Sequence, residues 1–137
     1  MIPLGTYNNP TKTKPYLTYS LILINILVFV WELSLPPSDL TQAFFQLSIV
    51  PCQFVYGFSP VQIVDFFRSM FLHADIWHLI GNMIFLWIFA TNVEDVLGRR
   101  RFLLLYFAGG FVAALVHTVL YHYVCLPLIG ASGAISA

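Results

Sequence analysis

The sequence predicts an all-α integral membrane protein, a bundle of three transmembrane helices and the start of a fourth, with a long, partly helical first loop. Hydrophobic residues make up 59% of the 137 residues and charged residues only 9%, and the mean hydropathy is +0.83. A soluble domain carries roughly 25% charged residues, so this chain has too few charges to cover a surface that faces water. Three apolar segments long enough to cross a bilayer are the second observation.

The first apolar segment runs from Leu17 to Leu35, and its only formal charge is Glu32. As a helix it would extend about 28 Å, close to the hydrocarbon thickness of a bilayer. Pro36 and Pro37 follow directly and are expected to end it. The apolar core is too long for a signal peptide and lacks a small-residue cleavage site, so we predict a retained membrane helix.

Residues 36–76 form a long connection of mixed polarity. Two stretches, 41–50 and 60–72, combine aromatic and aliphatic residues with isolated polar ones, and neither is long enough to span a bilayer. Turn residues lie around Pro51 and at 57–60. We interpret the two stretches as short helices in the membrane interface, in preference to an ordinary loop.

The second span is predicted at about 77–93 and the third at about 102–126, with a turn of acidic and basic residues between them. Glycine and alanine form two pairs four residues apart on the third span, which allow another helix backbone to approach closely; they are Gly109/Ala113 and Gly110/Ala114. Pro127 is expected to end this span, and a fourth apolar helix begins near Ser132. The membrane domain is thus predicted to cover residues 17–137.

Basic residues are distributed unevenly between the two ends of this bundle. If the spans alternate, Lys12, Lys14 and the arginines at 99–101 fall on one side, and only Arg68 falls on the other. Such an excess marks the cytoplasmic side. The N-terminal segment, residues 1–16, is therefore predicted to be cytoplasmic, and the first loop and residues 130–137 to lie outside. A bacterial inner membrane or a plasma membrane is the expected location.

Charge and cysteine content argue against several classes of ligand. The formal net charge is zero, and no basic cluster with interleaved aromatics indicates nucleic acid. Cys52 and Cys125 form neither a CxxC pair nor part of a His/Cys cluster, so no metal is expected. They could form one disulfide in an oxidising compartment, but unpaired buried cysteine is common, and we expect them to be unpaired.

Ser132 lies between glycines in the sequence Gly130-Ala131-Ser132-Gly133, at the start of the fourth apolar helix. The glycines allow a sharp turn and a close approach of substrate. Free backbone N–H groups and the positive end of the helix dipole suit a developing oxyanion. This pattern predicts a nucleophile. The alternative is a plain helix N-cap, a position that serine favours.

His78 and Asn82 are four residues apart and therefore share one face of the second span. Polar side chains inside a span are costly and usually face a cavity or a partner. Both can donate hydrogen bonds without carrying a charge. Because His78 and Ser132 both fall at the outer end of their spans, the pair could stabilise an oxyanion opposite Ser132. The alternative is a hydrogen bond between packed helices.

These motifs resemble the rhomboid family of intramembrane serine proteases over about residues 17–137. Three elements occur in the family's order: His73-Ala74-Asp75-Ile76-Trp77-His78-Leu79-Ile80-Gly81-Asn82, then Glu94 with Gly98, then Gly130-Ala131-Ser132-Gly133. Phe67-Arg68 is similar to an aromatic-Arg element in the family's first loop, with Phe where Trp is common.

The resemblance implies a rhomboid-like helical bundle in a lipid bilayer that cleaves transmembrane protein substrates without a cofactor. It implies that Ser132 is the nucleophile, and that His78, Asn82 and the Ser132 backbone N–H form the oxyanion hole. The remaining matched positions would be structural, with His73 at the junction between loop and helix; they are His73, Arg68, Glu94, Gly98, Gly130 and Gly133.

The general base is the missing part of this machinery. In the family a histidine on the sixth span completes the catalytic dyad, and these 137 residues do not reach such a span. His117 and His122 are five residues apart on the predicted third span, about 140° around the helix, and neither matches a motif for the base. We predict that both are packing or interface residues, and that this chain alone is inactive.

Two other functions are compatible with parts of the sequence. An inactive rhomboid relative could bind membrane clients without cutting them, although such a protein has no need of Ser132, His78 and Asn82 together. A piece of a transporter or channel would have helix breaks near the bilayer centre, whereas the polar residues here lie at one end of their spans. The sequence favours the protease.

Overall fold

The computed structural model describes residues 14–57 and 59–136. Three of its helices are long and apolar enough to cross a membrane, namely Tyr16–Ser34, Ile76–Leu97 and Arg99–Leu120. Within the described residues the only β-type contact is an isolated bridge between Ile49 and Leu128. The all-helical class predicted from the sequence is therefore confirmed. Lys12 and most of the N-terminal segment lie outside the described residues.

The first membrane helix is α1 (Tyr16–Ser34), and its buried residues form one stripe. They are Thr18, Leu21, Asn25, Phe29 and Glu32. Their spacing of three and four residues places them on a single face of the helix, which packs against the second membrane helix. The remaining faces expose large apolar side chains such as Leu27 and Leu33, as expected for a helix in lipid.

The second membrane helix consists of three consecutive parts, α4 (Ile76–Phe85), the π-helical turn η3 (Leu86–Ala90) and α5 (Thr91–Leu97). Asp75 caps its start by accepting a hydrogen bond from the His78 backbone N–H at 2.9 Å. Gly98, at φ +75°, separates α5 from α6 (Arg99–Leu120). A positive φ is favourable for glycine alone among the common residues, so Gly98 allows the reversal between the second and third spans.

The third membrane helix ends six residues earlier than the sequence predicted, at Leu120 rather than Leu126. Tertiary contacts hold the following residues in an irregular segment. The Cys52 backbone N–H donates to the Val124 carbonyl at 2.9 Å, and the Leu128 N–H donates to the Ile49 carbonyl at 2.7 Å. These bonds to the first loop replace the helical ones. The 22 residues of α6 still extend about 33 Å, enough to cross a bilayer.

Cys52 and Cys125 form a disulfide, so the expectation that they are unpaired is wrong. Their sequence positions, 73 residues apart, gave no indication of this proximity. The backbone bonds just described lie beside the disulfide, so the first loop and the segment before Ser132 are joined both covalently and by hydrogen bonds.

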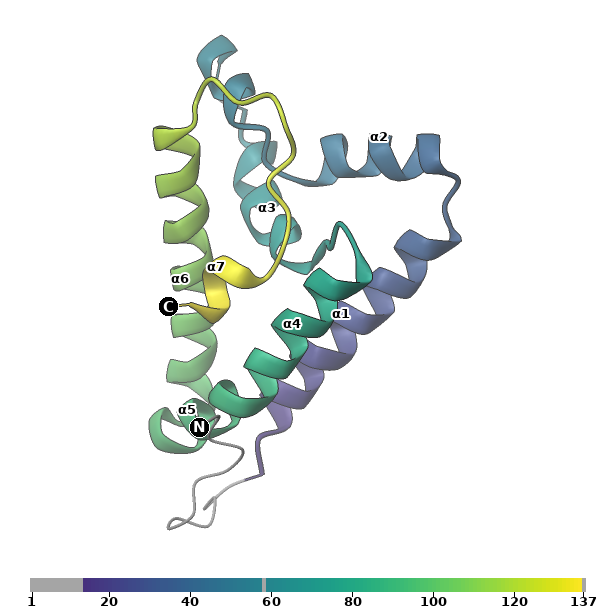
Figure 1. Ribbon diagram of the computed structural model, residues 1–137. Coiled ribbons are helices and arrows are strands. Elements are labelled where there is room, and N and C mark those ends of the chain that lie inside the picture. The colour runs from purple at the N-terminus through teal and green to yellow at the C-terminus, as the bar shows by residue number, and fades with distance from the viewer. Residues whose placement is uncertain (1–13, 58, 137) are drawn as a thin grey trace.

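The first loop is helical over much of its length, as predicted. It contains α2 (Pro37–Leu47), η1 (Pro51–Tyr56), α3 (Val61–Arg68) and η2 (Ser69–Phe71). Figure 1 shows α2 extending away from the other helices, and none of its residues is buried. By contrast, α3 and η2 pack into the bundle through Phe66 and Met70, which are each 2% exposed.

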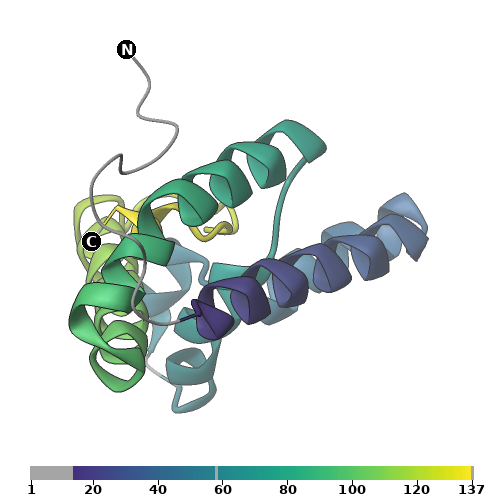
Figure 2. The ribbon, with the colours of Figure 1, turned by 90° about the horizontal axis from the view of Figure 1, so that it is seen from below.

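The short helix α7 (Ser132–Ile135) lies between α4 and α6 in both ribbon views (Figures 1 and 2). Small residues on α6 make this position possible, because a Cβ added at Gly133 would lie 2.8 Å from the Cβ of Ala113. A Cβ at Gly110 would likewise lie 3.0 Å from the Cβ of Ala134. The glycine and alanine pattern of the third span therefore accommodates α7.

Candidate active site

Ser132 is the first residue of α7 and is exposed. The N-cap of this helix is Ala131, and no side chain caps it. The plain N-cap alternative for Ser132 is therefore not what the structure contains. The carbonyl oxygen of Ser132 accepts hydrogen bonds from the backbone N–H and the hydroxyl of Ser136, at 3.0 and 2.7 Å. In the first turn of a helix the backbone N–H groups have no partner within the helix.

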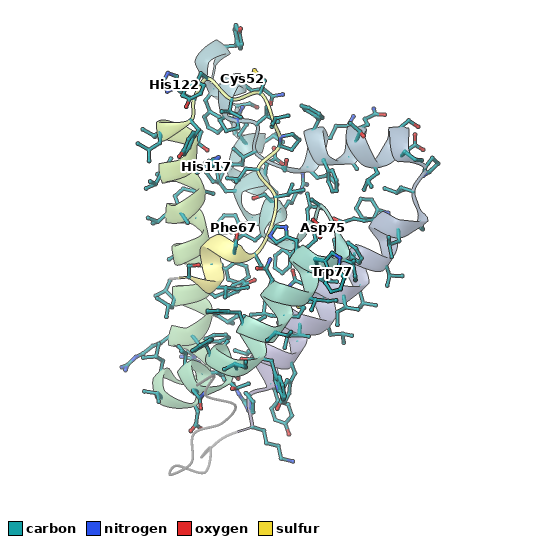
Figure 3. The ribbon with its side chains drawn as sticks, viewed as in Figure 1. Cys52, Phe67, Asp75, Trp77, His117 and His122 are labelled. Carbon is teal, nitrogen blue, oxygen red and sulfur yellow. A yellow bond between two sulfur atoms is a disulfide. The ribbon has the colours of Figure 1, made fainter. Side chains whose placement is uncertain are left out.

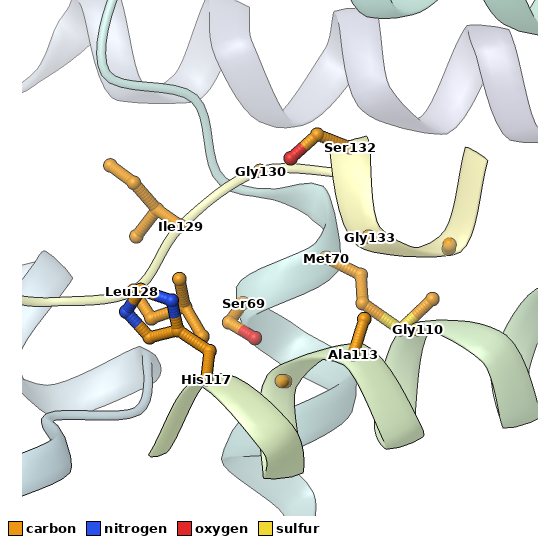
Figure 4. Close-up of a pocket in the computed structure, with 12 residues that line it drawn as sticks. Ser69, Met70, Gly110, Ala113, His117, Leu128, Ile129, Gly130, Ser132 and Gly133 are labelled. Carbon is orange, nitrogen blue, oxygen red and sulfur yellow. The ribbon is translucent and has the colours of Figure 1, made fainter. Parts of the chain in front are cut away.

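A cavity of about 220 Å³ adjoins Ser132. Its walls come from η2 (Ser69 and Met70), from α6 (Gly110, Ala113, Ala114 and His117) and from residues 128–130 and 132–134. Figure 4 places Ser132 and His117 on opposite sides of it. The cavity combines apolar walls with a few polar groups, as small-ligand and side-chain pockets do.

The ring of His78 lies directly against Gly130, two residues before Ser132. A Cβ added at Gly130 would lie 2.5 Å from Cε1 and 2.7 Å from Nε2 of His78. Gly130 itself has φ +120°, and its N–H donates to the Ser69 carbonyl at 2.8 Å. The second span and the serine segment are therefore in close contact at this point, and only glycine leaves room for the histidine ring.

Replacing Gly130 by alanine is expected to move the His78 ring away from the serine segment and to lower any activity of Ser132 at least about 100-fold, since misplacement by about 1 Å can cost that much. Gly57 provides a matched control, because it has a similar φ of +136° but no atom within 4 Å of an added Cβ. Gly57→Ala should therefore reproduce the backbone strain and leave the contact between His78 and Gly130 intact. Cleavage rates of the two variants in liposomes are compared, and equal losses would contradict the role of the His78 contact.

Asn82 lies one turn beyond His78 on α4 and is 8% exposed. Its Nδ2 donates to Nε2 of His73 at 3.0 Å, and the other ring nitrogen of His73, Nδ1, lies 3.2 Å from the Phe71 carbonyl oxygen. A carbonyl can only accept, so Nδ1 carries the proton and Nε2 is the acceptor. Burial lowers the pKa of His73 to about 4, which agrees with a neutral ring.

The buried, neutral His73 predicts a pH dependence of folding. Because the pKa falls from 6.5 to about 4 on folding, the unfolded chain binds a proton between these values that the folded chain does not. The stability from this group is present above pH 6.5 and is lost as the pH falls toward 4, by up to about 3 kcal/mol. Unfolding by SDS in mixed micelles at pH 7.5 and pH 5 measures this. His73→Gln should weaken the pH dependence, whereas His122→Gln, at an exposed position, should not.

Two further predicted structural residues, Glu94 and Arg68, make side-chain contacts in other parts of the fold. The carboxylate of Glu94, on α5, accepts from the backbone N–H groups of Leu17 and Thr18 at 3.1 and 2.8 Å and from the Thr18 hydroxyl at 2.8 Å. It thus caps the start of α1. Arg68, on α3, forms an ion pair with Asp65 at 3.2 Å; burial raises the pKa of Asp65, and the Arg68 charge opposes that shift.

Of the two histidines on or after α6, His117 is the one that faces the serine cavity, which sequence reasoning missed. It packs on Tyr121 at 4.7 Å between ring centroids. The sequence contained a pattern that places His117 on this face, because it follows residues 110, 113 and 114 at the i, i+3, i+4, i+7 spacing of one helix face. His122 lies after the end of α6, at the same end of the molecule as Cys52 (Figure 3), with Nδ1 3.2 Å from the Val119 carbonyl.

Within residues 14–57 and 59–136, no three His, Cys, Asp or Glu side chains gather in a way that could hold a metal ion. The polar side chains that line the cavity are those of Ser69, His117 and Ser132. His78 lies against Gly130, which also lines it, whereas Asn82 is bonded to His73 and is not a lining residue.

Comparison with known proteins identifies the family. The family model of the rhomboid domain matches residues 60–137. Rhomboid protein 1, mitochondrial, of Saccharomyces cerevisiae is 33% identical over 140 residues, covering 98% of this chain and 37% of that protein. Rhomboid protease GluP of Bacillus subtilis is 44% identical over 64 residues, covering 47% of this chain and 12% of that protein.

The presenilin-associated rhomboid-like protein, mitochondrial, of Rattus norvegicus is 35% identical over 74 residues, covering 49% of this chain and 18% of that protein. No solved structure gives a significant match. The chain thus spans less than two fifths of the length of these three relatives. With a family model that matches more than half of its residues, this chain belongs to the rhomboid family.

Proposed function

We propose that this chain carries the nucleophile and the oxyanion donors of an intramembrane serine endopeptidase that cleaves transmembrane protein substrates. The observation that supports this most directly is the packing of the His78 ring against Gly130, two residues before Ser132. Two segments that are 52 positions apart in the sequence, each with one part of the motif, are in contact at one site. Similarity to a relative named as a rhomboid protease supports the same function.

In the proposed reaction the Ser132 hydroxyl attacks the carbonyl carbon of a peptide bond in the substrate. A general base takes the hydroxyl proton as the C–O bond forms, and the carbonyl oxygen becomes an oxyanion. His78, Asn82 and the Ser132 backbone N–H donate hydrogen bonds to it. The base then protonates the leaving amine, and water hydrolyses the acyl-enzyme. A non-cleaving relative that binds membrane clients is the alternative, and the experiment below separates the two.

The general base is proposed to be a histidine outside residues 1–137. His73 uses both ring nitrogens in buried hydrogen bonds, and His122 lies at the disulfide end, away from the serine cavity. His117 is across the cavity from Ser132. His78 lies against Gly130, where the proposal uses it as an oxyanion donor.

Labelling with a fluorophosphonate probe tests the function. The protein expressed from its own gene is reconstituted in liposomes, and the adduct is located by mass spectrometry. A single adduct on the peptide that contains Ser132, together with cleavage of a transmembrane substrate, is expected. Residues 1–137 expressed by themselves should remain unlabelled. Absence of both labelling and cleavage in the natural product would favour client binding, and labelling of residues 1–137 alone would place the base among its four histidines.

The orientation proposed for the bundle follows from its two chemically different ends. Arg99, Arg100 and Arg101 are exposed at the joint between α5 and α6, and Lys14 is exposed just before α1. The only basic residue of the first loop, Arg68, is paired with Asp65. Cys52, one half of the disulfide, lies at the other end (Figure 3). We therefore propose that the arginine end lies in the cytoplasm, in a bacterial inner membrane or a plasma membrane, and that the disulfide end lies in an oxidising compartment outside it.

Single-cysteine labelling in a Cys52→Ser/Cys125→Ser background is expected to show this orientation. A membrane-impermeant maleimide applied to intact cells should label Tyr56→Cys, at a position that is 89% exposed, and should label Arg100→Cys only after the cells are opened. The reverse pattern would overturn the assignment.

A further inference from the structure

Glu32 is a buried acidic residue inside a membrane helix, and the proposed reaction has not used it. It lies in the last turns of α1 and is 2% exposed. One carboxylate oxygen, Oε1, accepts the backbone N–H of His73 at 3.1 Å, and the other, Oε2, has no hydrogen-bond partner within the described residues. Burying such a group is costly, and an apolar side chain would fill the space at lower cost.

Glu32 contacts His73, the residue that controls the orientation of the Asn82 side-chain amide. His73 is 1% exposed and is held at three atoms: its N–H by Glu32, Nδ1–H by the Phe71 carbonyl, and Nε2 by the Asn82 amide. The bond from Asn82 Nδ2 to His73 fixes which end of the amide points toward the histidine. One N–H of Asn82 is used in this bond, and the other N–H is then the one available to an oxyanion.

His73 also contacts the second proposed oxyanion donor. Its ring meets that of His78 edge to face, with 5.3 Å between centroids and 65° between planes. His78 in turn lies against Gly130. A continuous set of contacts therefore leads from the end of α1, through His73, to both donors and to the serine segment.

We infer that Glu32 is a positioning residue for the oxyanion donors, which acts by fixing His73 through its backbone N–H. This inference rests on the proposed function for its catalytic consequence. The effect of Glu32 is exerted entirely through an acceptor atom, so the charge is not required. An amide oxygen at the same place can accept the same N–H.

Kinetics of two substitutions test the inference in the protein expressed from its own gene. Glu32→Gln retains an acceptor and is expected to keep kcat within threefold of the unchanged protein. Glu32→Leu has a similar volume and no acceptor, and it is expected to lower kcat at least tenfold with little change in KM. In an Asn82→Ala background the same Glu32→Leu change should lower kcat by a clearly smaller factor, because one of the two donors that it positions is gone and only His78 remains.

A purely structural role predicts a different pattern. Glu32→Leu would then lower the fraction of folded protein, so its effect would be equal in both backgrounds. An undiminished loss in the Asn82→Ala background, or full activity of Glu32→Leu, would overturn the inference. Asn25→Leu is the matched control, because Asn25 is also buried on the same face of α1 and its side chain interacts with the Leu21 carbonyl and with Tyr106 rather than with His73.

A spectroscopic measurement separates failure of this inference from failure of the proposed function. The Ser132→Ala protein is labelled with ¹⁵N-histidine and ¹⁵N-asparagine, and the ring nitrogens of His73 and the side-chain amide of Asn82 are followed by NMR. Glu32→Leu should shift or broaden both sets of signals, whereas Glu32→Gln and Asn25→Leu should leave them in place. Unchanged signals in Glu32→Leu would show that Glu32 does not position Asn82, whatever reaction Ser132 performs.

Discussion

On the proposed function, replacing Ser132 by alanine in the protein expressed from its own gene is expected to reduce the cleavage of a transmembrane substrate by about 10⁴-fold or more, and to abolish fluorophosphonate labelling. Removing the nucleophile of a serine hydrolase costs nearly as much as removing all members of its catalytic unit. The substitution removes one oxygen atom from an exposed side chain in the first turn of α7. The fold should therefore be retained, so the lost activity reports on chemistry.

Ser136 provides the matched control for this substitution. It lies one turn after Ser132, and its hydroxyl donates to the Ser132 carbonyl at 2.7 Å. Ser136→Ala removes the same atom type from the same short segment and should keep activity within a few-fold of the unchanged protein. Cleavage and labelling are measured for both variants in liposomes. Activity that survives in Ser132→Ala would show that another residue is the nucleophile.

Replacing Glu94 by alanine is expected to cause the largest loss of stability, roughly 3–5 kcal/mol, comparable to breaking a buried charged interaction. Glu94 is 1% exposed, and its two carboxylate oxygens accept three hydrogen bonds from Leu17 and Thr18 at the start of α1. Without the carboxylate, two backbone N–H groups and a hydroxyl are left buried with no acceptor. The first helix is then no longer fixed to the end of the second.

Unfolding by SDS in mixed micelles measures this loss. Glu94→Gln retains one acceptor oxygen and should lie between the alanine variant and the unchanged protein. Asp39→Ala is the control, because Asp39 is also acidic and in the first turn of a helix, but it is exposed on α2. That change is expected to cost less than about 0.5 kcal/mol. A similar loss in Asp39→Ala and Glu94→Ala would contradict the capping role.

The features that the sequence predicted well depend on local composition and spacing. The three membrane helices follow from apolar runs whose charged residues are limited to Glu32 and the turn between the second and third spans. The small-residue face of the third span predicted a close approach of another helix, which is α7. The joint between the second and third spans could be found because Gly98 separates two such runs. His78 and Gly130 were expected at the same end of the bundle from alternation of the spans alone.

The features that the sequence did not predict depend on contacts between distant segments. The end of α6 at Leu120 is set by bonds from Val124 and Leu128 to the first loop, and no helix-breaking residue marks it. Pairing of Cys52 with Cys125 required the same long-range contact. The contact of Glu32 with His73 joins residues 41 positions apart, and an isolated acidic residue in a span gave no indication of its partner.

The disulfide also imposes an order on biosynthesis. Cys52 and Cys125 enclose the whole of the second and third membrane helices, which lie between them in the chain. The bond can therefore form only after both helices have been inserted and the segment after Leu120 has reached the same side as the first loop. Because this segment leads directly into Gly130 and Ser132, the part of the chain that carries the serine is tied to the first loop at the step in which the disulfide forms.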